Sequence, residues 1–261
     1  MNEKKHMFDQ VANELYHPFP KELFKKYGVK RGLRNEDETG VMAGLTAVGQ
    51  VTGYYMEDGE KTPVEGVLKY RGYSLDKIVE SCERENRFGY EEVVFLLLFG
   101  ELPTKDQLDK FREILGAMRV LPDGFAEDMI LKAPSPNIMN KMARGVLAMY
   151  SYDENPDDIS TPNVLRQCLQ LIAQFPLLSV YGYHSYQHYH NGNSLFIHFP
   201  KPEYRTAENL LYILRENGEF SPLEAKMLDL ALVLHAEHGG GNNSTFTTHV
   251  VTSSGTDTYS A

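Results

Sequence analysis

Histidine, glycine and asparagine side chains concentrate in one segment of the sequence, Leu234 to Thr245, which reads Leu-His-Ala-Glu-His-Gly-Gly-Gly-Asn-Asn-Ser-Thr. His235 and His238 are three residues apart, so on the last turn of a helix they share one face. The glycines that follow let the backbone leave that helix without steric cost. Asn242 can cap the next helix, whose free N–H groups would converge with a protonated histidine. The segment therefore predicts a site for an anionic substrate.

Three other interpretations of this segment are possible. A zinc site prefers histidines four apart, as in H-E-x-x-H, with further ligands, and here the spacing is three with no cysteine nearby. A phosphate-binding loop needs a strand before the glycines and Lys-Ser/Thr after them, and here a helix precedes and no lysine follows. The two histidines can also simply satisfy the last helical carbonyls beside a glycine stop. The pattern alone does not choose between this structural role and substrate binding.

Two other polar clusters lack the spacing of a ligand site. The run from Tyr181 to His190 contains His184 and His188 four residues apart, but no carboxylate or cysteine completes a metal set. Tyrosine and histidine present an apolar body with a polar rim, which predicts a packed or interfacial surface. The aspartates of the segment 153–158 lack the spacing of a calcium loop, and the proline among them indicates a solvated connection.

The charge and cysteine content restrict the class of protein. Acidic side chains outnumber basic ones by 36 to 26, which gives a formal charge of −10 with histidine neutral. This negative field repels DNA, RNA and anionic membranes. The two cysteines, Cys82 and Cys168, are far apart and fit a reducing compartment. The N-terminus lacks an apolar signal segment, and the run Val93–Phe99 is far shorter than the ~18 residues of a membrane span. We expect a soluble, cytoplasmic protein with no nucleic-acid or membrane partner.

The distribution of apolar residues predicts an all-α fold with a small N-terminal β-hairpin. Residues 1–43 are polar and punctuated by proline and glycine, which indicates an arm with one short helix. Between residues 44 and 73, β-branched and aromatic residues around Asp58-Gly59 indicate the hairpin. Beyond Ser74 the apolar residues follow a helical period, and helix start signals occur at Thr104, Ser135-Pro136, Thr161-Pro162, Thr206 and Ser221-Pro222.

The helical part is expected to form one domain over residues 44–261. Pro176 should kink or end the helix that starts near Thr161, and the connections 151–161 and 184–204 are predicted to be loops. The helix predicted over 222–238 carries a nearly continuous apolar run from Met227 to Leu234. Such a helix is buried on more than one face, either in the centre of the domain or against a second subunit.

Three motifs resemble the citrate synthase family. They are Gly66-Val-Leu-Lys-Tyr-Arg-Gly-Tyr73, Leu96-Leu-Leu-Phe-Gly-Glu-Leu-Pro-Thr104 and His235-Ala-Glu-His-Gly-Gly-Gly-Asn-Asn-Ser-Thr245, in the family's order and at similar separations. The resemblance runs from about residue 28 to the last residue. The segment Lys30–Asn35 is similar to the bacterial form found in anaerobic Gram-positive organisms.

The resemblance implies a mostly helical homodimer with a large and a small domain. It implies an acyltransferase of the tricarboxylic acid cycle that condenses acetyl-CoA with oxaloacetate to give citrate and free CoA. In this chemistry a carboxylate takes a proton from the acetyl methyl, a neutral histidine stabilises the enol oxygen and a second histidine polarises the ketone. By this resemblance His238 binds oxaloacetate, and His235 and Asn242 line or support the pocket. No metal or organic cofactor is implied.

The sequence departs from the family pattern at its end. The family's catalytic His and Asp lie in segments that would follow Ala261, so no catalytic residue is assigned within the chain. Asp257 to Ala261 starts like a new helix and then stops, a piece too short to be stable or to bury anything. We expect an incomplete large helical domain, with the small catalytic domain absent, that is inactive by itself.

Two alternatives remain open. A 2-methylcitrate synthase uses propionyl-CoA, and the extra methylene is worth only ~1–3 kcal/mol in a pocket. A non-catalytic helical module that dimerises or binds dicarboxylates would fit the same residues.

Overall fold

The computed structural model describes residues 20–28, 30, 32–34, 39–41 and 46–261. The chain divides into two compact units, residues 1–44 and 45–261. The described residues of the first include a short helix, α2 (Lys21–Lys26), and an antiparallel bridge between Arg34 and Gly40. The short helix predicted for the arm is present, and much of the remaining arm, including part of the segment Lys30–Asn35, lies outside the described residues.

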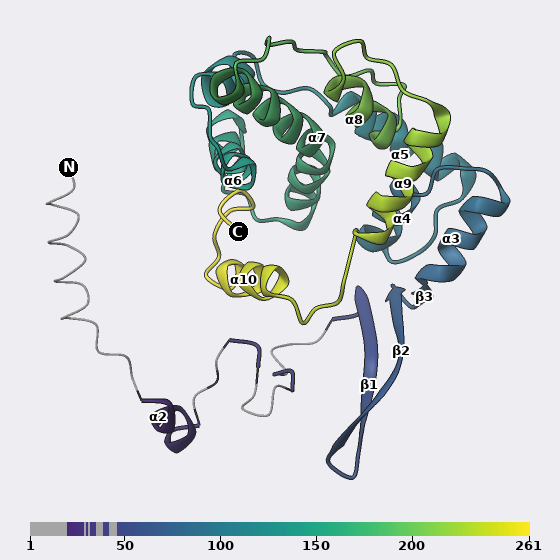
Figure 1. Ribbon diagram of the computed structural model, residues 1–261, viewed down its shortest axis with the longest axis vertical. Coiled ribbons are helices and arrows are strands. Elements are labelled where there is room, and N and C mark those ends of the chain that lie inside the picture. Colours follow the sequence, from purple (N-terminus) through teal and green to yellow (C-terminus); the bar gives the residue numbers. More distant parts are fainter. Residues whose placement is uncertain (1–19, 29, 31, 35–38, 42–45) are drawn as a thin grey trace, which may run out of the picture. The chain divides into compact units, whose positions relative to one another are not determined.

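The second unit begins with a three-stranded antiparallel sheet in the order β1 (Gly49–Glu57), β2 (Glu60–Tyr70) and β3 (Tyr73–Ser74) (Figure 1). Asp58 and Gly59 join β1 to β2 with φ values of 51° and 84°. A two-residue turn with both φ angles positive matches the twist of the strands, which is why Asp-Gly predicts a hairpin. The predicted hairpin is confirmed, and Arg71-Gly72 forms a second turn with positive φ before β3.

The rest of the unit is helical, which confirms the predicted mainly helical class (Figure 1). The helices are α3 (Leu75–Arg84), α4 (Tyr90–Phe99), α5 (Lys105–Ala117), α6 (Ile138–Met149), α7 (Thr161–Asn191), α8 (Thr206–Leu214), α9 (Pro222–Leu234) and α10 (Asn243–Thr252). A π-helical segment, Ala126–Leu131, precedes α6, and a short 3-10 turn, Tyr150–Tyr152, follows it.

Two of the predicted capping boxes are present. The Gln107 N–H donates to Thr104 Oγ1 at 3.3 Å at the start of α5, and the Glu224 N–H donates to Ser221 Oγ at 3.2 Å at the start of α9. Thr206, predicted as a cap, is instead the first residue of α8, and its N–H donates to the buried carboxylate of Glu91 at 2.8 Å. Because Glu91 comes from α4, this contact depends on tertiary packing and has no local sequence signal.

Helix α7 differs from the prediction in length. It runs for 31 residues and passes through Pro176. Pro176 has no N–H to donate, but it and the adjacent Leu177 and Leu178 are buried. The packing of this apolar surface outweighs the lost hydrogen bond. The loop predicted over 184–204 is therefore wrong for residues 184–191, which belong to the helix.

The largest core cluster is formed by the π-helical segment, α6, α7 and α8, and it includes Phe125, Ile130, Leu177 and Ile213. A second cluster joins Tyr70 of the sheet to α3, α4 and Val233 of α9. A third joins α4, α5 and α7. The sheet thus contributes to the helical core mainly through Tyr70, at the end of β2 nearest the helices.

The last residues do not behave as predicted. The segment 257–261 is a turn rather than the start of a helix, and its Tyr259 is buried in the core cluster of α6–α8. The Tyr259 hydroxyl donates to Asp153 at 2.5 Å, and Thr258 Oγ1 donates to Gln167 at 2.5 Å. The expectation that this segment buries nothing is wrong because its one large side chain fills a gap between helices that the sequence pattern does not reveal.

Asp153 also contradicts the prediction of a solvated connection. Its side chain is 3% exposed and accepts hydrogen bonds from Arg166, Gln167, Tyr259 and the Asn155 N–H. These donors hold the pKa of the Asp153 carboxyl well below its usual range, despite the opposing effect of burial. Asp153 is therefore a structural anion that joins the C-terminal segment to α7.

Helix α9 buries one face within the chain. Ala225, Asp229 and Val233 are spaced by four and are buried, whereas Leu223 and Met227 are 66% and 64% exposed. The single chain therefore does not bury α9 on more than one face, as its apolar sequence predicted. Of the two explanations given for that sequence, burial in the centre of the domain is wrong, and burial against a second subunit stays a prediction.

Candidate functional site

The histidine segment lies where α9 ends, beside the sheet (Figure 1). Helix α9 stops at Leu234, four residues before the predicted end, and His235 is its C-cap with φ −104° and ψ 4°. The Tyr70 hydroxyl donates to the carbonyl oxygens of Val233 at 2.8 Å and Leu234 at 3.3 Å. The prediction that His235 and His238 share a face of the last turn is wrong, because His238 lies beyond the helix.

His235 is exposed, and one of its ring nitrogens is engaged. Nδ1 lies 2.7 Å from the carbonyl oxygen of Ala231. Since a carbonyl oxygen only accepts, Nδ1 carries the proton, and in the neutral ring Nε2 is an acceptor. The capping role expected as an alternative is therefore real for His235. It can donate to an anion only as the imidazolium, through Nε2–H.

The three glycines do not end the helix, which stops before them. They let the loop pass directly against the base of the hairpin. Gly239 has a φ of 91°, and a Cβ atom there would lie 2.8 Å from Cγ2 of Val51 on β1. A Cβ atom at Gly240 would lie 2.7 Å from Cγ2 of Thr46. Gly239 and Gly240 are thus required by the close approach of the Val51 and Thr46 side chains rather than by helix termination.

Asn242 is the N-cap of α10, as predicted. Its Oδ1 accepts the Thr245 N–H at 2.8 Å, and its Nδ2 donates to Thr245 Oγ1 at 2.9 Å and to the carbonyl oxygen of Gly239. Both ends of the amide are therefore occupied by the loop and by α10. Asn242 can support the shape of the site, whereas direct binding of a ligand would have to displace one of these bonds.

His238 differs from both neighbours. It is exposed, and within the part of the chain that the structure describes its ring has no hydrogen-bond partner. The residues on either side are fixed, because the Gly239 N–H donates to Oε1 of Glu237. Of the three predicted site residues, His238 alone has a side chain with no hydrogen-bond partner among the described residues.

The second histidine run is structural at His184. This ring is buried, lies 3.1 Å from the carbonyl oxygen of Ile213 through Nε2 and packs on Phe196 with ring centroids 4.3 Å apart. Burial lowers its pKa. The packed surface predicted for this run is confirmed at His184. Among the residues described, no three His, Cys, Asp or Glu side chains are grouped so that they could hold a metal ion.

Asp229 is a buried acid that the sequence analysis missed. Oδ2 accepts the Gly89 N–H at 2.7 Å and Oδ1 accepts the Tyr90 N–H at 3.2 Å, so this α9 side chain caps the start of α4. Burial raises the pKa of Asp229 to about 6, although the two N–H donors act against it. A signal was available, since a lone carboxylate within the apolar run Met227–Leu234 has to find partners when the helix packs.

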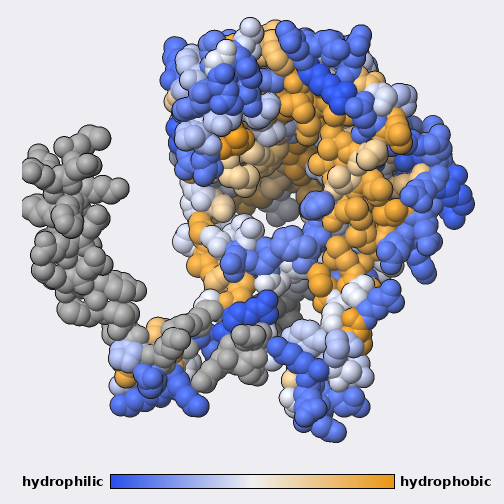
Figure 2. Space-filling model, in the orientation of Figure 1, coloured by the Kyte–Doolittle hydropathy of each residue, from blue (hydrophilic) through white to orange (hydrophobic). Residues whose placement is uncertain are grey.

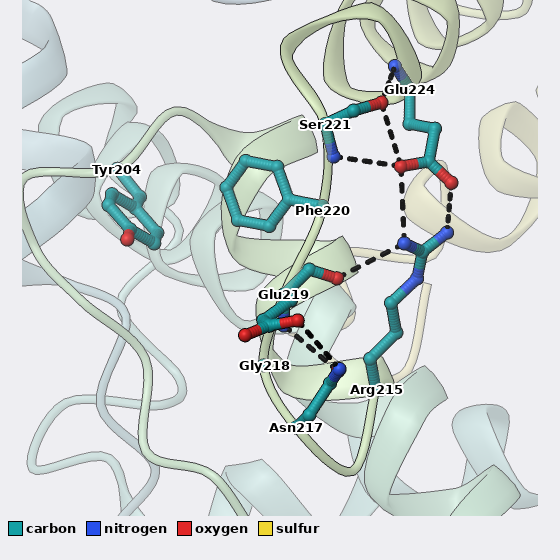
Figure 3. A pocket seen from close by; sticks show the side chains of 8 residues that line it. All are labelled: Tyr204, Arg215, Asn217, Gly218, Glu219, Phe220, Ser221 and Glu224. Carbon is teal, nitrogen blue, oxygen red and sulfur yellow. Dashed lines mark hydrogen bonds and ion pairs between the residues drawn. The ribbon is translucent and has the colours of Figure 1, made fainter.

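A pocket of about 750 Å³ lies at the connection from α8 to α9 (Figure 3), and no residue of the histidine segment lines it. Arg215 crosses it to pair with Glu224 at 2.5 Å and donates to the carbonyl oxygen of Glu219 at 3.1 Å. The Arg215 hydrogen bond lowers the pKa of Glu224 to about 2. Arg215, the cationic side chain that lines the pocket, is thus already paired with Glu224, so it is not free to bind a dicarboxylate. The lining residues are Tyr204, Arg215, Asn217, Gly218, Glu219, Phe220, Ser221 and Glu224.

Comparison with known families gives a match over most of the chain. Residues 36–261 match the family model described as "Citrate synthase, C-terminal domain". The chain belongs to the citrate synthase family. Citrate synthase of Haloferax volcanii is 36% identical over 204 residues, which cover 75% of this chain and 49% of that protein. 2-Methylcitrate synthase 2 of Corynebacterium glutamicum is 31% identical over 226 residues, which cover 85% of this chain and 53% of that protein.

Solved citrate synthase structures share the fold. The enzyme from Pyrobaculum aerophilum superposes with a TM-score of 0.70 and 26% identity, covering 89% of this chain and 55% of its own. The citrate synthase of Thermoplasma acidophilum, solved as a ternary complex with carboxymethyl coenzyme A and oxaloacetate, gives a TM-score of 0.68 at 23% identity, with 84% and 51% covered. The predicted citrate synthase-like helical fold is confirmed. The chain spans about half the length of the curated relatives it matches.

Relatives named citrate synthase and 2-methylcitrate synthase both match, so the acyl substrate is not resolved within this citrate synthase family member. Within the described chain no helix is both long and apolar enough to cross a membrane.

Proposed function

We propose that this chain provides the oxaloacetate-binding part of a citrate synthase. The whole enzyme would condense acetyl-CoA with oxaloacetate to give citrate and free CoA, in the cytoplasm and without a metal or organic cofactor. The observation that carries the proposal is His238, an exposed imidazole with no protein partner among the described residues, held between two fixed neighbours. An imidazole N–H donates to a carboxylate or ketone oxygen, which are the groups that oxaloacetate presents.

The supporting roles follow from the contacts of the other two residues. His235 has its Nδ1 on the Ala231 carbonyl oxygen, which fixes the orientation of the ring, and its Nε2 is free of this bond to serve as a second contact for the anion when protonated. Asn242 joins the Gly239 carbonyl to the first turn of α10 and holds the loop in shape. In this assignment His238 contacts the substrate, His235 contributes charge, and Asn242 is a supporting residue.

The catalytic base and the enol-stabilising histidine are assigned to the part of the family's length that this chain does not cover. General acid–base and electrostatic contributions each amount to about 10²–10⁴-fold in rate, so the chain alone should not turn over at a measurable rate. We therefore expect no release of CoA by the 261-residue chain from acetyl-CoA and oxaloacetate.

A fusion tests this proposal directly. The chain is joined to the portion of Haloferax volcanii citrate synthase that it does not cover, and oxaloacetate-dependent release of CoA is measured with a thiol reagent. We expect activity in the fusion and none in the chain. His238→Ala should lower kcat/KM for oxaloacetate at least about 100-fold, a loss typical of a group that contacts the reacting substrate, while Thr247→Ala should leave it unchanged. Equal kinetics for the two variants would contradict the assignment of His238.

Acyl-CoA specificity is measured in the same assay. Propionyl-CoA replaces acetyl-CoA, and the ratio of the two kcat/KM values decides between a citrate synthase and the alternative, a 2-methylcitrate synthase. A folded fusion that is inactive with either thioester, combined with saturable binding of oxaloacetate to the chain, would instead favour the non-catalytic dicarboxylate-binding module.

We further propose that two copies of the chain associate through the exposed face of α9. Three exposed apolar side chains lie at helical spacing on this face: Leu223, Met227 and Leu234. Figure 2 shows hydrophobic residues around a hollow on this side of the helical unit. Large exposed apolar patches commonly mark subunit contacts, and obligate dimers bury about 2,000 Å² or more. Light scattering should give twice the chain mass of 29.7 kDa, and Met227→Asp should reduce it to one chain mass.

A further inference from the structure

The hydroxyl of Tyr70 occupies an unusual place in the second unit. Tyr70 ends β2 and is fully buried, yet its hydroxyl reaches the last two carbonyls of α9, 163 and 164 residues further along the chain. The last four carbonyls of a helix have no partner within the helix. Tyr70 supplies a partner for two of these carbonyls, those of Val233 and Leu234, which immediately precede His235. Burial raises the pKa of this hydroxyl, so it remains a proton donor.

The Tyr70 ring is itself held firmly. It packs in the core cluster with Leu75, Ile78, Leu96 and Val233. The next residue, Arg71, adopts a positive φ of 49° in the turn to β3 and donates from Nε and Nη2 to the Leu97 carbonyl at 3.0 and 2.7 Å. Two consecutive residues of one turn therefore bind carbonyls near the ends of two helices, α9 and α4.

The cross-strand partner of Tyr70 holds the loop at a second point. Gly49 of β1 pairs with Tyr70 in the sheet. A Cβ atom at Gly49 would lie 2.5 Å from Oε1 and 2.6 Å from Cγ of Glu237, so the Glu237 side chain lies directly on the Gly49 backbone. Two residues further along β1, Val51 lies against Gly239.

His238 is therefore placed between two residues that the hairpin fixes. Glu237 rests on Gly49 and accepts the Gly239 N–H, and Gly239 rests on Val51. The helix end before them is held by Tyr70. The exposed histidine takes its position from the base of the hairpin rather than from its own contacts.

We propose that Tyr70 is a positioning residue for His238, acting through the end of α9 together with its strand partner Gly49. The hydroxyl fixes the peptide that precedes His235, and the Gly49 backbone fixes Glu237. The inference rests on the proposed function only where it concerns oxaloacetate, since the geometry of the loop can be measured without substrate.

Tyr70→Phe tests it, because the variant keeps the ring and removes only the hydroxyl. The 261-residue chain is labelled at histidine Cε1, and its ¹H–¹³C signals are assigned with His235→Ala and His238→Ala. We expect the signals of His235 and His238 to shift in Tyr70→Phe, while His184, buried on α7 with Nε2 on the Ile213 carbonyl of α8, keeps its signal.

Tyr181→Phe is the matched control. Tyr181 is 3% exposed, and its hydroxyl also donates to a distant carbonyl, that of His198, at 2.8 Å. It should cost a similar amount of stability and leave His235 and His238 unchanged. Unchanged signals in Tyr70→Phe would overturn the proposal, and so would equal shifts in both variants, which would indicate general loosening. If Tyr70→Phe does not fold, Gly49→Ala tests the same loop through the contact with Glu237.

Titration with oxaloacetate separates this proposal from the proposed function. In the unaltered chain oxaloacetate should shift the His238 signal, and in Tyr70→Phe the apparent Kd should rise roughly tenfold, as expected when a binding group is displaced by a fraction of an ångström. If oxaloacetate shifts no histidine signal in the unaltered chain, the proposed function fails. Positioning by Tyr70 is still judged by the ligand-free spectra.

Discussion

The helices α6 to α8 and the loop after α9 make opposite use of polar side chains. Around α6–α8 the polar groups near the core turn inward, as Asp153 does with four donors and His184 does with the Ile213 carbonyl. In the loop, His235 and His238 are exposed, and one of them has no partner in the described chain. A ligand-binding group has to remain accessible, so it contributes little to its own placement. The loop is instead held from outside, by Tyr70 and Gly49.

The largest loss of stability is expected from the core around α8. Ile213 is fully buried, and Ile213→Ala removes three carbons and leaves a cavity, which should lower the free energy of unfolding by about 2–5 kcal/mol. Val250 on α10 is 53% exposed, and Val250→Ala should cost less than about 0.5 kcal/mol in the monomer. Urea denaturation followed by circular dichroism measures both. A comparable loss in Val250→Ala would mean that α10 packs as tightly as α8, and the contrast would fail.

Asp153→Asn should have the next largest effect. The amide keeps one acceptor oxygen and replaces the other with an NH2 group, which cannot accept from Arg166, Gln167 or Tyr259. Hydrogen bonds to a charged group contribute about 1.5–3 kcal/mol, and we expect a loss in this range at pH 7. The control is Asp157→Asn, because the exposed Asp157 carboxylate accepts, among the described residues, only the Tyr150 hydroxyl. Equal melting temperatures for the two variants would show that the buried network adds nothing.

Asp229 should give stability a specific pH dependence. Its folded pKa of about 6 lies above the ordinary value of 3.8. Between these two pH values the Asp229 carboxyl is therefore protonated in the folded chain and ionised in the unfolded chain. Stability from this group is complete below about pH 4 and is lost as the pH rises through 6, by about 1–3 kcal/mol. Glu91 reinforces the shift and Arg112 opposes it.

The difference in unfolding free energy between the unaltered chain and Asp229→Asn isolates this effect, because other carboxyl groups titrate in both. Chemical denaturation at pH 4.5, 6 and 7.5 should show that the unaltered chain loses stability relative to Asp229→Asn as the pH rises. A difference that is constant over this range would mean that the Asp229 carboxylate is ionised throughout.

The smallest effect on stability is expected at the loop. His238→Ala removes an exposed side chain with no partner in the described chain, so the free energy of unfolding should change by less than about 0.5 kcal/mol. In the fusion, the same substitution is the one expected to lower kcat/KM for oxaloacetate at least about 100-fold. Thermal denaturation of His238→Ala and Thr247→Ala should give melting temperatures close to that of the unaltered chain. A clear destabilisation by His238→Ala alone would assign the residue a structural role.

The sequence by itself determined the class of the fold and identified the histidine segment on which the proposed site rests. Local chemistry suffices for the Asp58-Gly59 turn, the boxes at Thr104 and Ser221 and the cap at Asn242, because each depends on residues within three positions. Hydrophobic period located most helices, and the His-Gly-Asn motif identified the family that the wider comparison then established. Each of these features depends on a short stretch of sequence, so it can be predicted without knowing which residues pack against it.

Only the tertiary structure decided where α9 ends, how far α7 continues and what the last five residues bury. Helix α9 ends at Leu234, where a phenol from a distant strand takes up its carbonyls, and α7 continues past Pro176 because the buried leucines beside it outweigh one missing hydrogen bond. The Tyr259 hydroxyl donates a hydrogen bond to Asp153, more than 100 residues away in the sequence. Buried polar groups and the carbonyls at helix ends find their hydrogen-bond partners among residues that are remote in sequence. Local sequence patterns therefore do not predict these partners.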